Sequence, residues 1–303
     1  MTQVFGETID LSDFLEEKVE GRNIRPADYW AEPLENYFYG DNIVKGAMLP
    51  WEKTHANIRL RGGEVSLWMG QNGHGKSLIT SLVSLNLCAQ GFKVCVASME
   101  MKPPATLARM ARQATGTNLP SKSSLCEFNE WTSGLLWLYD KRGQLDWQTM
   151  IAVIKYGVHH FGIQHFFVDS LMKCVKGEDD YNGQKDFTNA LCSAAQDLDI
   201  HIHLIHHVKK PSEGESKVPG KYDAKGSGSI VDQVDNVFGI WRNKNKEDDR
   251  REFGRTDETK VDQLVICDKQ RNGEWEGKVG LWYDPASFQY RSDYEDLRRI
   301  KYF

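Results

Sequence analysis

Short apolar runs alternate with longer amphipathic stretches from residue 64 towards the C-terminal end of the chain. The runs are rich in Val, Ile, Leu, Phe and Trp, as buried strands are, whereas the longer stretches space their apolar residues as helices do. The predicted strands are 64–69, 93–98, 135–139, 164–169, 200–206, 236–241, 263–268 and 279–283. The predicted helices are 77–89, 104–114, 147–161 and 184–198. This alternation predicts an α/β fold with a mostly parallel twisted sheet flanked by helices, which binds ligands at the carboxyl ends of its strands.

Residues 1–61 lack this strand-rich pattern, so we treat them as an N-terminal arm and residues 62–303 as the main domain. Apolar residues recur in the arm at helical spacing and predict an amphipathic helix: Leu11, Phe14, Leu15 and Val19. That helix either caps its own domain or docks on a neighbouring subunit, and the pattern favours neither. An aromatic stretch at 29–39 is expected to pack over the edge of the domain.

Two segments interrupt the pattern and are expected to be loops. Residues 208–228 are rich in Lys, Gly, Ser and Pro, and residues 242–260 are dense in both signs of charge. We interpret the second segment as a solvated surface insertion.

Composition limits the class of protein. The 303 residues are 40% apolar and 27% charged, which is ordinary for a globular protein. No apolar run approaches the ~20 residues of a membrane span, and the N-terminus lacks the order of a signal peptide, so we expect no membrane partner and a cytoplasmic setting. A net charge of −5 argues against a protein that coats nucleic acid everywhere but permits a local basic channel.

A phosphate-binding loop follows the first predicted strand and opens the first predicted helix. It has the GxxxxGKS pattern and consists of Gly70, Gln71, Asn72, Gly73, His74, Gly75, Lys76 and Ser77. The glycines let backbone N–H groups face the phosphates of a nucleotide, and the start of the helix adds its positive dipole end. We expect Lys76 to reach the outer phosphates and Ser77 to hold Mg²⁺.

Two carboxylates stand where hydrolysis would need them. Asp169 ends a predicted buried strand, where it would hold Mg²⁺. Glu100 follows the strand at 93–98, which we expect to lie beside the phosphate-loop strand. Glu100 is a candidate to orient the attacking water, and it also fits as an acidic residue stabilised by the dipole of the next helix.

Imidazoles alternate with apolar residues along the strand at 200–206. His201 and His203 would share one face, but no carboxylate or Cys completes a four-ligand set, which disfavours a metal site. His207 ends this run near the expected nucleotide and is a candidate sensor of the γ-phosphate.

The ordered set of motifs resembles that of ring-shaped replicative DNA helicases of the DnaB family, above all the helicase half of bacteriophage primase-helicases. The segments that carry the resemblance are 70–77, 98–100, 166–169, 207–211, 225–228 and 268–273. The resemblance implies a RecA-like core that forms a hexamer, with nucleotide at each subunit interface and single-stranded DNA in the central channel.

The resemblance also implies roles for individual residues. It assigns Lys76 to the phosphates, Ser77 and Asp169 to Mg²⁺, Glu100 to the catalytic base and His207 to the γ-phosphate sensor. It makes Arg271 an arginine finger that enters the neighbour's nucleotide site, with Lys269 beside it, and it places Tyr283 against the nucleotide base. Tyr283 fits edge packing as well. DNA contacts are expected from the loop residues Lys209, Lys210, Lys225, Gly226 and Ser227.

The function expected from these features is an NTP-driven hexameric helicase, using ATP or a dNTP with Mg²⁺, that moves 5′–3′ on single-stranded DNA and unwinds duplex in a bacterial or phage-infected cell. Residues 1–61 resemble no primase module, so primase and polymerase are expected as separate replisome partners. Two alternatives remain: a RecA-like DNA-dependent ATPase that loads or regulates without unwinding, and a small-molecule kinase.

Overall fold

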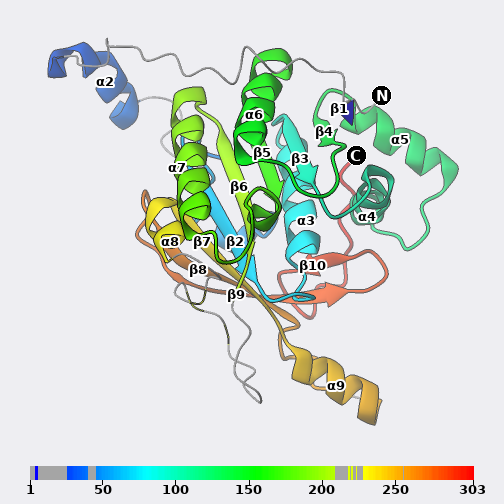
Figure 1. Cartoon of the computed structure of the whole chain (residues 1–303). Helices are drawn as coiled ribbons and strands as arrows, with labels where there is room; N and C mark the ends of the chain where they lie inside the picture. Colours follow the sequence, from blue (N-terminus) through cyan, green and yellow to red (C-terminus); the bar gives the residue numbers. More distant parts are fainter. Residues whose placement is uncertain are drawn as a thin grey trace.

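A ten-stranded sheet forms the centre of the molecule (Figure 1). The structure, a computed structural model, describes residues 4–5, 26–39, 46–208, 218, 220, 223, 228–254 and 256–303. The strands are β1 (Val4–Phe5), β2 (Val65–Gly70), β3 (Val94–Ser98), β4 (Leu136–Tyr139), β5 (His165–Asp169), β6 (His201–His207), β7 (Asn236–Arg242), β8 (Gln263–Gln270), β9 (Gly277–Asp284) and β10 (Gln289–Arg291). Their order is β1-β4-β3-β5-β6-β2-β7-β8-β9-β10. Neighbours from β1 to β7 are parallel, and β8, β9 and β10 continue the sheet with antiparallel pairs.

Helices cover both faces of the sheet. They are α2 (Ala31–Tyr39), α3 (Lys76–Ala89), α4 (Pro103–Thr115), α5 (Lys122–Thr132), α6 (Trp147–Phe161), α7 (Tyr181–Leu198), α8 (Ser229–Gln233) and α9 (Lys244–Phe253). Short 3₁₀ turns are η1 (Ala27–Trp30), η2 (Glu52–Thr54) and η3 (Leu171–Lys173). None of these described helices has both the length and the apolar character needed to cross a membrane.

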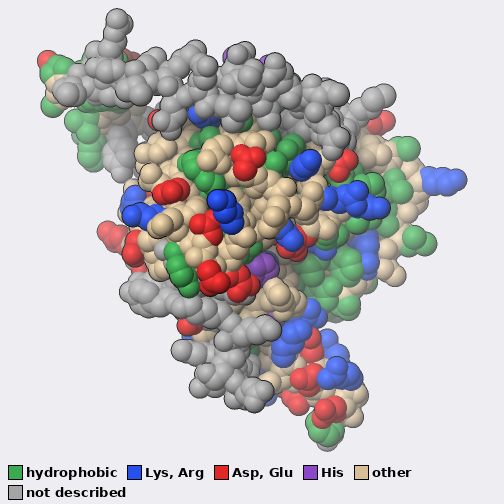
Figure 2. All heavy atoms as spheres, viewed as in Figure 1, with side chains coloured by type: hydrophobic (Ala, Val, Ile, Leu, Met, Phe, Trp, Pro, Cys, Tyr) green, Lys and Arg blue, Asp and Glu red, His purple; other side chains and the backbone are tan. Residues whose placement is uncertain are grey.

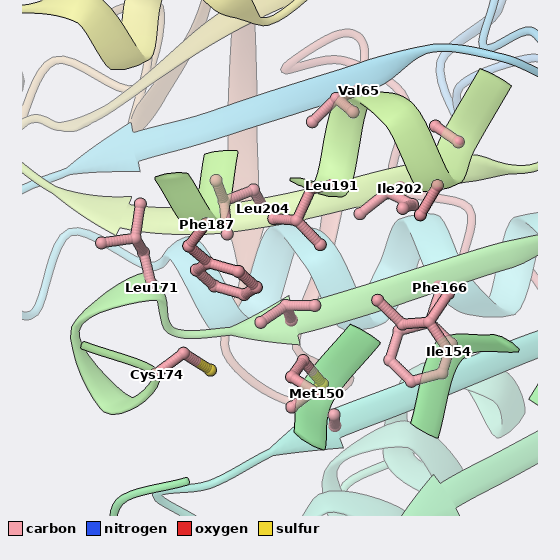
Figure 3. Close-up of a cluster of buried hydrophobic side chains, with 14 of the residues drawn as sticks. Val65, Met150, Ile154, Phe166, Leu171, Cys174, Phe187, Leu191, Ile202 and Leu204 are labelled. Atoms are coloured by element: carbon pink, nitrogen blue, oxygen red, sulfur yellow. The ribbon is translucent and has the colours of Figure 1, made fainter. Parts of the chain in front are cut away.

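Alternate residues of β2 face two separate hydrophobic cores. Val65, Leu67 and Met69 pack with α6 and α7 in the first core, which also holds Phe166 and Phe187 (Figure 3). Trp68 faces the second core, which contains residues of α3 and α4 together with Leu49, Trp51, Ile58 and Leu60. Every residue of β2 is buried, so hydrophobic burial on both faces holds this strand in place.

The helix ends follow local chemistry. The Asp146 side chain accepts a hydrogen bond from the N–H of Thr149 and begins α6, while Asn243 caps α9 in the same way through Lys246. Gly116 and Gly162 end α4 and α6 in the left-handed conformation, where a glycine carries no Cβ penalty.

The predicted α/β architecture is confirmed, and each strand and helix predicted from residue 64 onwards has a counterpart with similar bounds. The elements β1, β10, α2, α5 and α8 were not predicted. One expectation of a loop is wrong, because residues 244–253 of the charged segment form α9. Its ends are stabilised by the Asn243 cap and by ion pairs one helical turn apart, such as Arg251 with Asp248 at 2.6 Å.

Two further expectations are wrong. The strand β3 does not lie beside β2, because β5 and β6 come between them. Residues 29–39 form η1 and α2 but do not pack over the domain edge: Trp30, Leu34 and Tyr39 are 53%, 58% and 83% exposed. Figure 2 shows hydrophobic side chains of this segment at the surface, at the upper left of the view. The predicted helix around Leu11 lies outside the described residues, and the division at residue 61 stays a prediction.

Candidate nucleotide-binding site

The phosphate loop connects the carboxyl end of β2 to the start of α3, as its sequence predicts. Gly73 and Gly75 have φ values of +76° and +84°, which L-residues with a side chain rarely adopt. Gly75 is also the N-cap of α3. The loop therefore turns onto the N-terminus of a buried helix, where the orphan N–H groups and the helix dipole favour an anion.

Lys76 lies inside this turn. Its Nζ donates to the carbonyl oxygens of Gly70 at 2.8 Å and Gln71 at 3.0 Å, and it lies 3.2 Å from His207 Nδ1. Burial lowers the pKa of Lys76 to about 8, against the opposing charges of Asp169 and Glu100. The β2–β6 pairing aligns Gly70 with His207, so the predicted sensor stands directly beside the phosphate loop.

Asp169 meets the start of α3 from the end of β5. Ser77 Oγ donates to Asp169 Oδ2 at 3.2 Å. Burial, reinforced by the charge of Glu100, raises the pKa of Asp169 to about 6. A hydroxyl and a carboxylate at the edge of a phosphate site are the hard oxygen ligands that suit Mg²⁺, so this pair fits the expected ion.

A cavity of about 430 Å³ opens in front of these groups. Its lining residues are Asn72, Gly73, Gly75, Lys76, Ser77, Leu78, Glu100, Arg109, Asp169, His207 and Arg242. Glu100 reaches it from β3 although two strands separate β3 from β2, because the carboxyl ends of all these parallel strands meet at one edge. Glu100 also lies 3.9 Å from Lys173 Nζ.

At the opposite end of the cavity, Arg242 at the end of β7 lines the wall, and residues of β7 and β8 hold the phosphate loop. The Arg242 N–H donates to His74 Nδ1 at 3.2 Å, and Gln263 Nε2 donates to the His74 carbonyl at 3.1 Å. Burial is the main cause that lowers the pKa of His74 to about 4, with Lys244 adding to it, so the ring accepts the Arg242 N–H as a neutral imidazole. The loop is thus anchored on the side away from Asp169.

Lys269 and Arg271 do not reach this cavity. They lie at the end of β8, which is antiparallel to β7 and pairs Gln270 with Asn236. Asp235 accepts the N–H of Val65, the first residue of β2, and Arg271 Nη1 lies 3.3 Å from Asp235 Oδ1. Arg271 therefore stands at the start of β2, whereas the phosphate loop stands at its end, about 17 Å farther along the strand.

A protein-family model described as an AAA domain matches residues 56–213, slightly more than half of the chain. This protein belongs to that family. The matched AAA domain contains the phosphate loop, Glu100, Asp169 and His207.

Two solved structures share the fold of this AAA-domain protein. One is described as the "ATPase Domain of G40P"; it matches with a TM-score of 0.71 and 17% identity, over 87% of this chain and 97% of its own. The other is a DnaB-like replicative helicase studied with its primase, with a TM-score of 0.74 and 17% identity, over 88% of this chain and 68% of its own. The RecA-like fold of DnaB-type helicase ATPase domains, expected from the motifs, is confirmed.

Other residues that the sequence singled out lie away from this cavity or fall outside the described residues. Tyr283 does not line the cavity; it packs against Tyr290, with ring centroids 5.1 Å apart. His201 and His203 are buried and hydrogen-bonded, to Ser66 at 2.8 Å and to Trp68 at 3.1 Å. The predicted DNA contacts lie outside the described residues: Lys209, Lys210, Lys225, Gly226 and Ser227.

Two charged cavity residues, Arg109 and Arg242, were missed from the sequence, as was the apolar Leu78. Arg109 lies on α4, nine positions after Glu100, and its guanidinium lies near enough to Asp169 that their charges interact. Its only sequence signal is its place on the helix that follows Glu100. Arg242 ends β7 beside the phosphate loop, a neighbour that only the strand order reveals.

Proposed function

We propose that this AAA-domain protein is an NTP-driven hexameric replicative DNA helicase that moves 5′–3′ on single-stranded DNA and unwinds duplex. One observation carries the proposal. The cavity that holds Lys76, Glu100 and Asp169 lies at one edge of the sheet, and Arg271 lies at the other. A nucleotide site that needs Arg271 must therefore receive it from another subunit.

The proposed chemistry is hydrolysis of the γ-phosphate. A water oxygen attacks the γ-phosphorus, the bond to the oxygen between the β- and γ-phosphates breaks, and the proton of the water passes to Glu100. Lys76 binds the phosphates, and Arg109 adds positive charge at the Asp169 end of the cavity. Mg²⁺ held beside Ser77 and Asp169 would neutralise phosphate charge.

Arg271 supplies the remaining positive charge in trans. Charge spreads over the transferred phosphoryl group, and an arginine finger stabilises it by on the order of 10³–10⁵ in rate. Because each nucleotide site then contains Arg271 of the neighbouring subunit, hydrolysis is coupled to contacts between subunits. The exposed apolar side chains of α2 support such assembly, since a neighbouring copy would bury them.

Single-stranded DNA is the proposed track. The segment 209–227, which carries Lys209, Lys210 and Lys225, joins β6, where the proposed sensor His207 lies, to α8. Lysines and backbone N–H groups there would bind DNA phosphates without reading sequence. Primase is a proposed partner because the similar helicase was studied with its primase, and a replicative polymerase is the other.

Nucleotide hydrolysis with and without single-stranded oligonucleotide tests the proposal. Lys76→Ala should abolish hydrolysis. Arg271→Ala should abolish DNA-stimulated turnover while a fluorescent nucleotide still binds, because the phosphate loop is untouched. Arg298→Ala, at a side chain that is 88% exposed, serves as the control. Stimulated turnover that survives in Arg271→Ala would refute the finger assignment.

Strand displacement separates the helicase from its closest alternative. A loader or regulator would hydrolyse nucleotide on DNA without releasing a strand from a forked duplex. Particle mass with a nonhydrolysable nucleotide tests the ring, and a chain that stays monomeric would contradict it.

A further inference from the structure

A buried carboxylate braces the turn that carries Arg271. Asn272 Nδ2 donates to Glu64 Oε1 at 2.8 Å, and Asn236 Nδ2 donates to Glu64 Oε2 at 3.0 Å. Glu64 is only 2% exposed. A carboxylate is costly to bury unless hydrogen bonds or an opposite charge compensate it. Arg61 Nη1 lies 3.5 Å from Glu64 Oε1 and supplies such a charge, and the two shorter amide bonds orient the carboxylate.

The remaining contacts of the turn lead to α8 and to the start of β7. Lys269 Nζ donates to the carbonyls of Val231 at 2.8 Å and Val234 at 2.7 Å. The Arg271 N–H donates to the Asp235 carbonyl at 2.9 Å. These bonds attach the turn to α8 and to the residue before β7, whereas the Asn272–Glu64 bond attaches it to the residue before β2.

Glu64 directly precedes β2, the buried strand whose other end is the phosphate loop. The same strand therefore supports the subunit's own nucleotide cavity at one end and the turn of Arg271 at the other. Because β2 is buried on both faces and paired on both edges, it is rigid, and its two ends keep a fixed distance and orientation.

We propose that Glu64, acting through Asn272, is a positioning residue for Arg271. It fixes the turn from which the guanidinium extends; in the isolated subunit this group donates to the Gln233 carbonyl at 3.1 Å and lies 3.3 Å from Asp235 Oδ1, and it would exchange these contacts for the nucleotide of the neighbour. This inference rests on the proposed function, because it gives Arg271 its role in trans.

The expected effect is on turnover and not on nucleotide affinity. A misplacement of about 1 Å in a catalytic group can cost on the order of 100-fold in rate. Loss of the Glu64–Asn272 bond leaves the contacts of Asp235 and Lys269 in place, so a loss of about tenfold in DNA-stimulated kcat is expected. Nucleotide affinity should stay the same, because the phosphate loop lies at the other end of β2.

An exchange of donor and acceptor tests the Glu64–Asn272 hydrogen bond, which we call the brace. Asn272→Asp sets a second carboxylate against Glu64, and Glu64→Gln sets an amide donor against the Asn272 amide; each should lower stimulated kcat about tenfold. In the double variant the Gln amide donates to the new carboxylate, its oxygen still accepts from Asn236, and the total charge of the pair is unchanged. Its kcat should return to within about threefold of the parent protein.

The controls distinguish this inference from the proposed function. Glu274→Gln, an exposed change in the same turn, should leave turnover intact, and melting temperatures should show that each variant folds. Single variants with full turnover, or a double variant whose two losses simply multiply, would overturn the brace. If Arg271→Ala itself keeps stimulated turnover, the finger assignment fails first. If only Arg271→Ala loses turnover, the finger stands and the brace fails.

Discussion

Ser77 and Asp169 are 92 residues apart in the sequence, and the Ser77 hydroxyl donates to Asp169 Oδ2 at 3.2 Å. The contact exists because β2 and β5 are parallel strands of one sheet, separated by β6, and both end at the same edge. The helix that follows β2 therefore presents its first hydroxyl to the carboxylate that ends β5. Both residues line the cavity, and Asp169 carries the first prediction.

Asp169→Asn should stabilise the protein at neutral pH while abolishing Mg²⁺-dependent hydrolysis. The folded pKa of Asp169 is raised from 3.8 to about 6, so its contribution to stability is complete below pH 3.8 and is lost as the pH rises through 6. A neutral amide avoids that loss. The melting temperature at pH 7.5, measured by calorimetry, should rise by on the order of 5 °C.

The rise in melting temperature caused by Asp169→Asn should vanish near pH 4, where Asp169 is protonated and its substitution changes no charge. Exposed Asp179→Asn is the matched control and should show no such pH dependence. A variant of Asp169 that melts lower than the parent at pH 7.5 would contradict the assignment of desolvation as the main cause.

Nucleotide affinity should weaken above pH 8. Burial lowers the pKa of Lys76 to about 8, and phosphate binding requires the charged amine, so each further pH unit should raise Kd by up to about tenfold. Titration of a fluorescent nucleotide between pH 7 and pH 9.5 measures the slope. Lys76→Arg keeps its charge throughout this range and should flatten it. An equally steep slope in that variant would assign the titration to another group.

Gly75→Ala should destabilise the protein more than Gly73→Ala. Both glycines have positive φ, so both substitutions carry a backbone cost of about 1–2 kcal/mol. A Cβ on Gly75 would lie 2.9 Å from Tyr290 Oη, whereas a Cβ on Gly73 meets nothing within 4 Å. Urea unfolding without nucleotide gives the difference. Adding Tyr290→Phe to Gly75→Ala should bring its free energy of unfolding close to that of Gly73→Ala; an unchanged gap would mean that Tyr290 is not the obstacle.

Lys246 should hold α9 to the body. Its side chain is 1% exposed, its Nζ lies 2.9 Å from Asp262 Oδ1, and it donates to the Lys260 carbonyl at 2.6 Å. Lys246→Met leaves Asp262 without this partner and should lower the free energy of unfolding by about 2 kcal/mol, with faster amide exchange in α9. Lys244→Met, at a side chain that is 45% exposed, should change neither. Unaltered exchange in the Lys246 variant would show that α9 is held by other contacts.

Local patterns predicted much of the fold and part of the site. Strands such as β2 and β5 are recognisable because burial on both faces leaves a continuous apolar run. The phosphate loop is recognisable because its residues are contiguous and each has a local task. The helix α9 was not predicted because it has no apolar periodicity; it is stabilised by the Asn243 cap and by ion pairs one helical turn apart. Arg109 and Arg242 escaped because nothing adjacent to them in the sequence marks a nucleotide site.

The sequence by itself determined most of the strands and the helices between them, the phosphate loop at 70–77 and the carboxylates at the strand ends, since each depends on side chains close together along the chain. Only the tertiary structure decided which strands are neighbours, because hydrogen bonds between parallel strands carry no sequence signature of order. That order placed β5 and β6 between β2 and β3 and still brought Glu100 to the cavity. It also set Arg271 at the far end of β2, where Glu64 and Asp235 hold the turn by contacts that span more than thirty residues of chain.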